Sequence, residues 1–586
     1  MGEESARLFP APRHLEAGGG AVDLEAPVRE VRDASLPSEG FDLVLSGDGA
    51  RIAYADANGR RYAEATLAQL RRQEPGRVRS LRIRDWPDFA VRGYLLDISR
   101  DRVPTRATLE HIVDRLALCR LNQLQLYTEH TFAYRDHECV WREASPLTPD
   151  DVRWLDACCS ERGIELVANQ NCFGHMGRWL RHAAYRSRAE APDGYTGPTG
   201  RHLAAASLAP TPDNARFALD LVRELMENFS SRRVNIGCDE TFELGEGVSR
   251  EAVRARGRGR VYLEHLLRLL SGLHDEGREV LFWGDILCSH PELVGELPRE
   301  DTIALAWTYE APVDPGALPA DLLAAMQRYG FTPGGFAEQV PAYAEARFPY
   351  WVCPGTSTWN SLVGRLPNAR ANLRDAAEVG LERGASGYLI TDWGDNGHLQ
   401  PPSVSFPPLA YGAALAWCAA SNRDLDLAGA LDAWIFGDAA GELGSVLEQI
   451  GSACVATGQR GLNASPLQGA LLQGGILGPF GETDEAGVRA LLESLEQARA
   501  RLERARPACP DGEVVVRELS QAVRLARHGA WRQLRAAGLA CPSDAALRED
   551  LAEAIEEQRA CWLARSRPGG LADSLARLEP TLATYA

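Results

Sequence analysis

Short apolar runs alternate with helical stretches through the middle of the chain, from about residue 90 to about residue 420. Eight runs read as buried strands, and after each of them apolar residues recur at helical spacing. This alternation predicts parallel strands, and eight such units in roughly 330 residues fit a (β/α)8 TIM barrel. The predicted strands are residues 91–98, 122–128, 163–170, 233–238, 279–285, 302–307, 350–355 and 387–393.

A doubly wound open sheet is the structural alternative, and the polar residues distinguish it from a barrel. In a TIM barrel the carboxyl ends of all strands meet at one mouth, where the chemistry of this fold lies. The carboxyl ends of the predicted strands carry acidic residues, which favours the barrel: Asp97, Glu129, Asp239 with Glu240, Asp285, and Asp392 with Asp395.

The two ends of the chain have different patterns. Residues 1–88 mix short apolar alternations such as FDLVLS with Gly and Pro, which predicts a small N-terminal α/β domain. Residues 423–586 contain stretches such as EAGVRALLESLEQARARLERAR, whose apolar spacing and charged faces predict a helical C-terminal domain. The barrel is therefore expected over residues 89–422. The C-terminal helices either pair two protomers into a homodimer or only pack on the barrel.

The composition and charge of the chain limit the kinds of partner that it is expected to bind. The 586 residues are 45% hydrophobic and 25% charged, which is ordinary globular usage. The formal net charge of −18 argues against nucleic acid or an anionic membrane as a partner, because both are bound through basic patches. The first residues lack the basic and apolar segments of a signal peptide, and the 13 cysteines have no repeating spacing. We therefore expect a soluble cytoplasmic protein.

The segment NIGCDETFELGEG (235–247) combines a buried strand with two adjacent carboxylates, Asp239 and Glu240. Where the chain turns at a strand end, both carboxylates can approach one ligand. Burial and mutual repulsion would raise one pKa and leave the other group ionised, as acid–base catalysis requires. The alternative is an Asp that caps the next helix, with Glu in its first turn.

This motif resembles glycoside hydrolase family 20, the β-N-acetylhexosaminidases, and in particular their hexosaminidase D-like branch. The resemblance implies that Asp239 orients the 2-acetamido group of the substrate and that Glu240 protonates the leaving oxygen. The segment RGYLLDISRDRVP (92–104) is similar to the first strand of the family, and the resemblance places Arg92 against sugar hydroxyls. NQNCFGHMGRWLRH (169–182) is similar to the third-strand segment, and His175 would face the pocket.

Further matches lie downstream in barrel order. FWGD (282–285) and TDWGDNGH (391–398) resemble the fifth and eighth strands of the family. The resemblance implies sugar-binding walls at Trp283 and Trp393, with Asp395 accepting hydrogen bonds from distal hydroxyls. Trp307 is expected to form a third wall.

One stretch departs from the family pattern. Family members carry a seventh-strand Tyr, followed closely by an Asp, that binds the acetamido oxygen, whereas CPGTSTWNSLVGR (353–365) offers Trp359 and no Tyr. Tyr309 is expected to supply the hydroxyl instead. In YTEHTFAY (127–134) we favour Glu129 over His130 as an acceptor for sugar hydroxyls.

Two acidic positions are interpreted as structural. Asp97 and Arg100 are expected to form a buried pair that supports the first strand, and Asp285 is expected to hold neighbouring loops.

The resemblance implies a retaining exo-enzyme that releases terminal β-linked GlcNAc or GalNAc from a small glycoside or oligosaccharide. The acetamido oxygen of the substrate would serve as the nucleophile, through an oxazolinium intermediate, so no cofactor is expected. The sequence has no Cys-x-x-Cys or His-Glu-x-x-His motif, so no metal site is expected either. Two alternatives stay open: a divergent glycosidase for another sugar, and a catalytically silent sugar-binding barrel.

Overall fold

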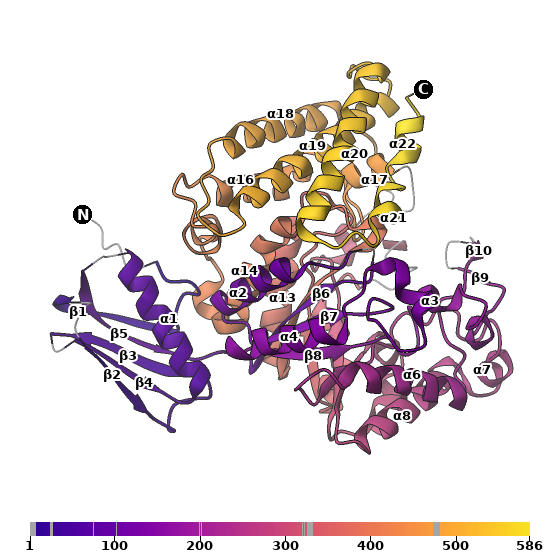
Figure 1. Ribbon diagram of the computed structural model, residues 1–586, viewed down its shortest axis with the longest axis horizontal. Coiled ribbons are helices and arrows are strands. Elements are labelled where there is room, and N and C mark those ends of the chain that lie inside the picture. The colour runs from indigo at the N-terminus through magenta and orange to yellow at the C-terminus, as the bar shows by residue number, and fades with distance from the viewer. Residues whose placement is uncertain are drawn as a thin grey trace.

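The computed structural model of the chain has three parts (Figure 1). It describes residues 7–23, 27–47, 49–73, 76–100, 102–197, 200, 202–318, 320, 323–324, 332–472 and 481–585. A barrel occupies the centre, a small sheet with one helix lies at its side, and a layer of helices from the C-terminal region covers it from above in this view.

The central element is a closed barrel of eight parallel strands. The strands follow one another around the barrel in chain order, with β15 paired to β6 and β8 paired to β11. This arrangement confirms the predicted TIM barrel and excludes the open sheet. The strands are β6 (Val91–Asp97), β7 (Gln123–Tyr127), β8 (Glu165–Asn169), β11 (Arg233–Asn235), β12 (Glu279–Trp283), β13 (Thr302–Trp307), β14 (Tyr350–Cys353) and β15 (Gly387–Asp392).

Helices surround the barrel and bury the outer faces of its strands. Several begin at a threonine whose hydroxyl accepts a hydrogen bond from a backbone N–H of the first turn, as Thr148 does from Asp151. The long helices are α2 (Arg106–Leu118), α4 (Pro149–Glu161), α6 (Pro212–Met226), α8 (Arg258–His274), α13 (Leu366–Arg383) and α14 (Pro402–Asn422). Shorter helices lie in the connections: α3 (Glu138–Trp141), α5 (Gly177–Leu180), α7 (Arg250–Arg256), α9 (Asp285–Cys288), α11 (Phe336–Gln339) and α12 (Pro341–Glu345).

The N-terminal part is a five-stranded sheet in the order β1-β5-β3-β4-β2, packed against helix α1 (Ala57–Gln73). Its small core also contains Trp417 and Cys418 of α14, which joins the sheet to the barrel. The predicted domain limit at residue 88 falls between β5 and β6, although the division into domains itself stays a prediction. The strands are β1 (His14–Asp23), β2 (Val28–Arg32), β3 (Phe41–Ser46), β4 (Gly49–Tyr54) and β5 (Arg77–Asp85).

The C-terminal part is helical, as its charge and apolar spacing indicated. A buried ion cluster ties it to the barrel: Arg565 contacts Asp511 at 2.6 Å and Glu518 at 2.9 Å, and Arg115 of α2 contacts Asp511 at 2.5 Å. Its helices are α15 (Leu427–Ala430), α16 (Leu443–Ser452), α17 (Pro466–Leu472), α18 (Glu485–Leu502), α19 (Gly512–Ala536), α20 (Asp544–Arg565), α21 (Leu571–Leu575) and α22 (Glu579–Ala583).

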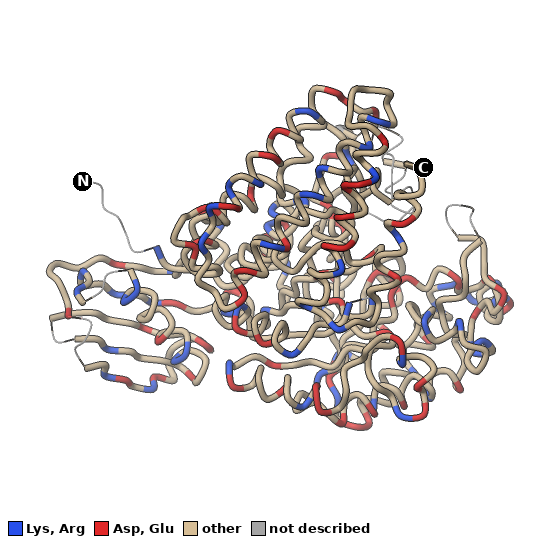
Figure 2. Tube along the Cα trace, turned by 45° about the horizontal axis from the view of Figure 1, so that its top comes forward, with Lys and Arg blue, Asp and Glu red and all other residues tan. Residues whose placement is uncertain are grey.

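Acidic and basic residues are interspersed along the trace of all three parts (Figure 2). Neighbouring helices are consequently linked by exposed pairs such as Arg517 with Glu557 at 2.5 Å. Within the described part of the chain, every helix is too short or too polar to cross a bilayer.

Candidate active site

The Asp239–Glu240 pair lies at the mouth of the barrel, in the loop that follows β11. The backbone there adopts left-handed conformations, with φ of 75° at Cys238 and 48° at Glu240. Such conformations are costly for residues other than glycine and concentrate at functional sites. The neighbouring loop after β8 approaches closely, since a Cβ on Gly174 would lie 2.2 Å from the Asp239 carbonyl oxygen. Two tightly packed turns therefore fix the direction of both carboxylates.

His175 lies between the carboxylates of Asp239, Glu240 and Glu129. Its Nε2 lies 3.3 Å from Asp239 Oδ2 and 3.4 Å from Glu240 Oε2, and its Nδ1 lies 3.8 Å from Glu129 Oε1. Burial alone would lower the pKa of His175, but the Asp239 carboxylate and then Glu240 outweigh burial and raise this pKa well above its usual value. This direction favours the protonated imidazole, which lies between the acidic groups and the Arg100 guanidinium, 3.3 Å from Nδ1.

The two members of the pair differ in exposure. The Asp239 side chain is 9% exposed and that of Glu240 is 38% exposed. Asp239 therefore lies inside the mouth and Glu240 at its rim. Behind them lies Asp285, which is partly buried and whose Oδ2 accepts a hydrogen bond from the Glu240 backbone N–H at 3.3 Å. Burial and then the Asp239 charge raise the pKa of Asp285 well above its usual value.

Aromatic rings line the interior of the mouth as one buried cluster. Trp307 stacks on Tyr309 with ring centroids 5.0 Å apart, and Tyr309 meets the edge of Trp359 at 5.2 Å. The cluster continues to the remaining predicted wall residues, with Trp283 and Trp393 at 5.9 Å. The indole nitrogens of Trp283, Trp307 and Trp359 are buried and find no hydrogen-bond partner among the described residues. The mouth thus offers apolar ring faces together with N–H donors.

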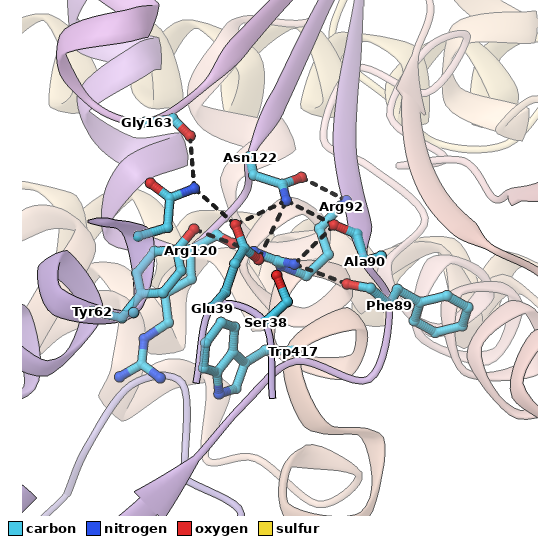
Figure 3. A network of polar contacts seen from close by, with 12 residues as sticks. Ser38, Glu39, Tyr62, Phe89, Ala90, Arg92, Arg120, Asn122, Gly163 and Trp417 are labelled. Atoms are coloured by element: carbon cyan, nitrogen blue, oxygen red, sulfur yellow. Dashed lines mark hydrogen bonds and ion pairs between the residues drawn. The ribbon is translucent and has the colours of Figure 1, made fainter. Parts of the chain in front are cut away.

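Arg92 does not belong to this site, so the sequence prediction for it is wrong (Figure 3). It lies near the start of β6, about 16 Å of extended chain from the mouth, because strands rise ~3.3 Å per residue. Its guanidinium is buried and contacts Glu39 at 2.7 Å. It also donates hydrogen bonds to the Arg120 carbonyl at 2.9 Å and the Phe89 carbonyl at 2.8 Å. Arg92 joins the N-terminal sheet to the amino end of the barrel.

Arg100, which the sequence interpretation treated as structural, lies at the mouth instead. Its Nη1 contacts Asp395 at 2.7 Å and Asp97 at 3.6 Å, so the expected pair with Asp97 is the weaker of the two. Its guanidinium also lies 5.1 Å from the Trp393 ring centre. The position of Arg100 in the sequence could have revealed it, since it lies three residues beyond the end of a barrel strand.

The other predicted site residues are gathered at the mouth. Glu129 is buried, and its Oε1 accepts a hydrogen bond from the Tyr127 hydroxyl at 3.0 Å. His130 points away from this group and lines a separate cavity of about 320 Å³. Within the described residues no three His, Cys, Asp or Glu side chains are arranged to hold a metal ion. The roles of Glu129, His175 and the aromatic residues stay predictions.

A parallel barrel whose mouth combines adjacent carboxylates with a wall of indole rings is the arrangement of a TIM-barrel glycoside hydrolase. The family model for the catalytic domain of glycosyl hydrolase family 20 matches residues 89–317, which include β6 to β13. The model for domain 2 of the same family matches residues 27–86, the region of β2 to β5. Residues 27–317 therefore match glycosyl hydrolase family 20 in both its domain 2 and its catalytic domain.

Characterised relatives carry related names. A β-hexosaminidase of Akkermansia muciniphila is 27% identical over 256 residues, which cover 40% of this chain and 51% of the relative. Human hexosaminidase D is 27% identical over 233 residues, covering 39% of this chain and 46% of the relative. The chain thus spans about half the length of the curated relatives that it matches.

Solved structures show the same fold. A β-N-acetylhexosaminidase of Streptomyces coelicolor superposes with a TM-score of 0.53 at 18% identity, covering 73% of this chain and 96% of the other. The chitobiase of Flavobacterium johnsoniae has a TM-score of 0.56 at 13% identity, covering 100% of both chains. At these identities the likeness concerns the fold alone.

Proposed function

We propose that this protein is a retaining exo-β-N-acetylhexosaminidase, which releases terminal β-linked GlcNAc or GalNAc from a small glycoside or oligosaccharide. The observation that carries the proposal is the Asp239–Glu240 pair, held by His175 at the mouth of a barrel lined with indole rings. The names of the relatives support it, as does the fold of a Vibrio harveyi exo-β-N-acetylglucosaminidase that was solved with N-acetylglucosamine (TM-score 0.55, 17% identity, 76% of this chain and 78% of that chain).

Substrate binding follows from the two kinds of surface in the mouth. A pyranose ring has an apolar C–H face that packs on indole rings and a rim of hydroxyls that needs polar partners. Trp283 and Trp393 supply the apolar surface. Arg100, Glu129 and Asp395 form a charged cluster beside it, with Arg100 contacting Asp395 at 2.7 Å and Glu129 at 3.9 Å. This cluster can donate hydrogen bonds to the hydroxyls of the terminal sugar and accept hydrogen bonds from them.

The reaction requires no nucleophile from the protein. The acetamido oxygen of the substrate attacks the anomeric carbon as the bond to the leaving oxygen breaks, which gives an oxazolinium ion and, after attack by water, a product of retained configuration. Glu240 gives its proton to the leaving oxygen and then accepts one from the attacking water. Asp239 lies 3.3 Å from His175 Nε2, and its carboxylate stabilises the cation that forms on the acetamido nitrogen.

Tyr309 is the proposed donor to the acetamido oxygen, in place of the seventh-strand Tyr of the family. It is 6% exposed, and Trp307 and Trp359 both pack against its ring. This packing holds the hydroxyl in one orientation, which suits a group that positions an attacking atom.

The test is a comparison of three substrates for the unmodified protein: 4-nitrophenyl β-N-acetylglucosaminide, its galacto epimer and 4-nitrophenyl β-glucoside. An internal nucleophile should make at least one acetamido sugar faster than the glucoside by on the order of 10²-fold or more. Comparable rates on the glucoside would instead indicate a glycosidase for another sugar. No reaction with any of the three would favour a silent sugar-binding barrel. The cytoplasmic location and the homodimer stay predictions.

A further inference from the structure

We propose that Phe242 forms a platform for the leaving group, a subsite outside the Asp239–Glu240 pair that takes β-linked aglycones with a flat apolar face, such as a second sugar ring or an aryl group. The inference rests on the proposed function, because it takes Glu240 as the residue that protonates the leaving oxygen.

The position of Glu240 defines where the leaving group must lie. The leaving oxygen has to come within hydrogen-bond reach of the Glu240 carboxyl. Because Asp239 and the indole rings are buried and Glu240 is 38% exposed, the terminal sugar lies inward and the aglycone lies outward, over the rim. Phe242 lies on this rim, two residues after Glu240, and is 43% exposed. Its backbone N–H donates to the Glu240 carbonyl oxygen at 2.7 Å, which fixes the turn between them.

The loop around Phe242 is held on both sides. Arg258 donates a hydrogen bond to the Thr241 carbonyl oxygen. The Glu243 carboxylate is 1% exposed and accepts hydrogen bonds from the backbone of Ala206 and Ser207, the latter at 3.0 Å. The Phe242 side chain is therefore carried by backbone that is anchored immediately before and after it.

A second buried carboxylate anchors the rest of this loop. Glu190 is 0% exposed and accepts hydrogen bonds from the backbone N–H groups of Gly245, Gly247 and Ser249 at 3.0 to 3.2 Å. Both anchors join the loop after β11 to the segment that follows β8. An aromatic side chain on anchored backbone loses less entropy on binding than one on a mobile loop, which favours binding at this place.

The ring face of Phe242 is available. Among the described residues no aromatic ring packs on it, whereas the rings of the inner wall pack on one another. An exposed apolar ring of this kind matches the apolar C–H face that a sugar ring presents.

The experiment compares the unsubstituted protein with Phe242→Ala and Phe242→Trp on three N-acetylglucosaminides: N,N′-diacetylchitobiose, the 4-nitrophenyl glycoside and the methyl glycoside. Only the first two carry a ring on the leaving side. Phe242→Ala should lower kcat/KM on these two by about tenfold, mainly through KM, and leave the methyl glycoside within about twofold. Phe242→Trp should keep the activity on the ring-bearing aglycones. Val248→Ala is the matched control, since Val248 is 57% exposed on the same loop and should have no effect.

An equal loss on all three substrates would overturn the proposal, because it would show that Phe242 only supports the position of Glu240. Unchanged kcat/KM on chitobiose would overturn it too. Failure of the proposed function is a separate result, since the unmodified protein would then hydrolyse none of the three glycosides.

Discussion

Asp285 lies behind the Asp239–Glu240 pair, and its role depends on whether it acts as a charge or as a hydrogen-bond acceptor. Burial and then the Asp239 charge raise its pKa well above the usual value, which favours the uncharged side chain. The contact that remains is the hydrogen bond from the Glu240 N–H, at a residue whose φ is 48°. We therefore expect Asp285 to position Glu240 through this bond.

Asp285→Asn should keep kcat/KM within about threefold, because the amide oxygen can still accept the bond. Asp285→Ala should lose about tenfold or more, since an unpaired buried N–H costs roughly 1–3 kcal/mol. Both variants are assayed on the 4-nitrophenyl N-acetylglucosaminide, with thermal unfolding as a check on folding. If the Asn variant lost as much as the Ala variant, the charge and not the bond would matter.

For single residues, the sequence predicts most of the side chains that lie at the mouth of the barrel, but it names Arg92 where the structure has Arg100. Residues at strand ends can be predicted, because the pattern and length of an apolar run indicate whether a residue lies at the amino or the carboxyl end of the strand. Arg92 and Arg100 lie near the two ends of β6. The resemblance of the segment that begins with Arg92 and Gly93 led to the wrong arginine. Arg92 pairs with Glu39 and Arg100 pairs with Asp395. Both partners are distant in sequence, so only the folded structure shows which arginine lies at the mouth.

Among the elements, the loops after β8 and β11 act as one unit. Gly174 in the first loop packs against the Asp239 carbonyl, where a methyl group would come within 2.2 Å of the oxygen. Gly174→Ala should displace the carboxylate pair and lower kcat by at least about tenfold, because small errors in position are costly in catalysis. The measurement is kcat and KM on the 4-nitrophenyl N-acetylglucosaminide.

Gly177→Ala is the control for this variant, since a Cβ there has its nearest neighbour at 3.6 Å and should leave kcat unchanged. Equal activities of the two glycine variants would show that the two loops do not fix the carboxylates. Such loop-to-loop contacts lie beyond what periodicity can predict, whereas the eight strands themselves are predicted within a few residues because apolar runs and helical spacing mark them directly.

For the whole molecule, the N-terminal sheet is held to the amino end of the barrel by the buried network around Arg92 and Glu39 (Figure 3). Asn122 and Asn58 also donate hydrogen bonds to Glu39. The sequence predicts that this part and the C-terminal helices exist, but not how they dock. The contacts that dock them, such as Arg115 with Asp511, join residues far apart in the chain.

Glu39→Gln should lower the thermal midpoint by several degrees, because it leaves a buried guanidinium without its carboxylate, an effect of about 3 kcal/mol or more. The kcat/KM of the folded fraction should stay within about twofold. Arg82→Gln is the control, since its pair with Asp42 has a 47% exposed arginine side chain and should contribute little. If Glu39→Gln raised KM without changing the thermal midpoint, the result would support a role of Arg92 in substrate binding and contradict this account.

The role of Glu240 is tested most directly by its dependence on the leaving group. We would measure kcat/KM of the unmodified protein and of Glu240→Gln on N,N′-diacetylchitobiose and on 2,4-dinitrophenyl β-N-acetylglucosaminide. Chitobiose releases a sugar hydroxyl that needs a proton, so the variant should lose on the order of 10²-fold or more, and much less on the dinitrophenyl substrate. Equal losses on both substrates, or no loss on chitobiose, would contradict the assignment of Glu240 as the general acid.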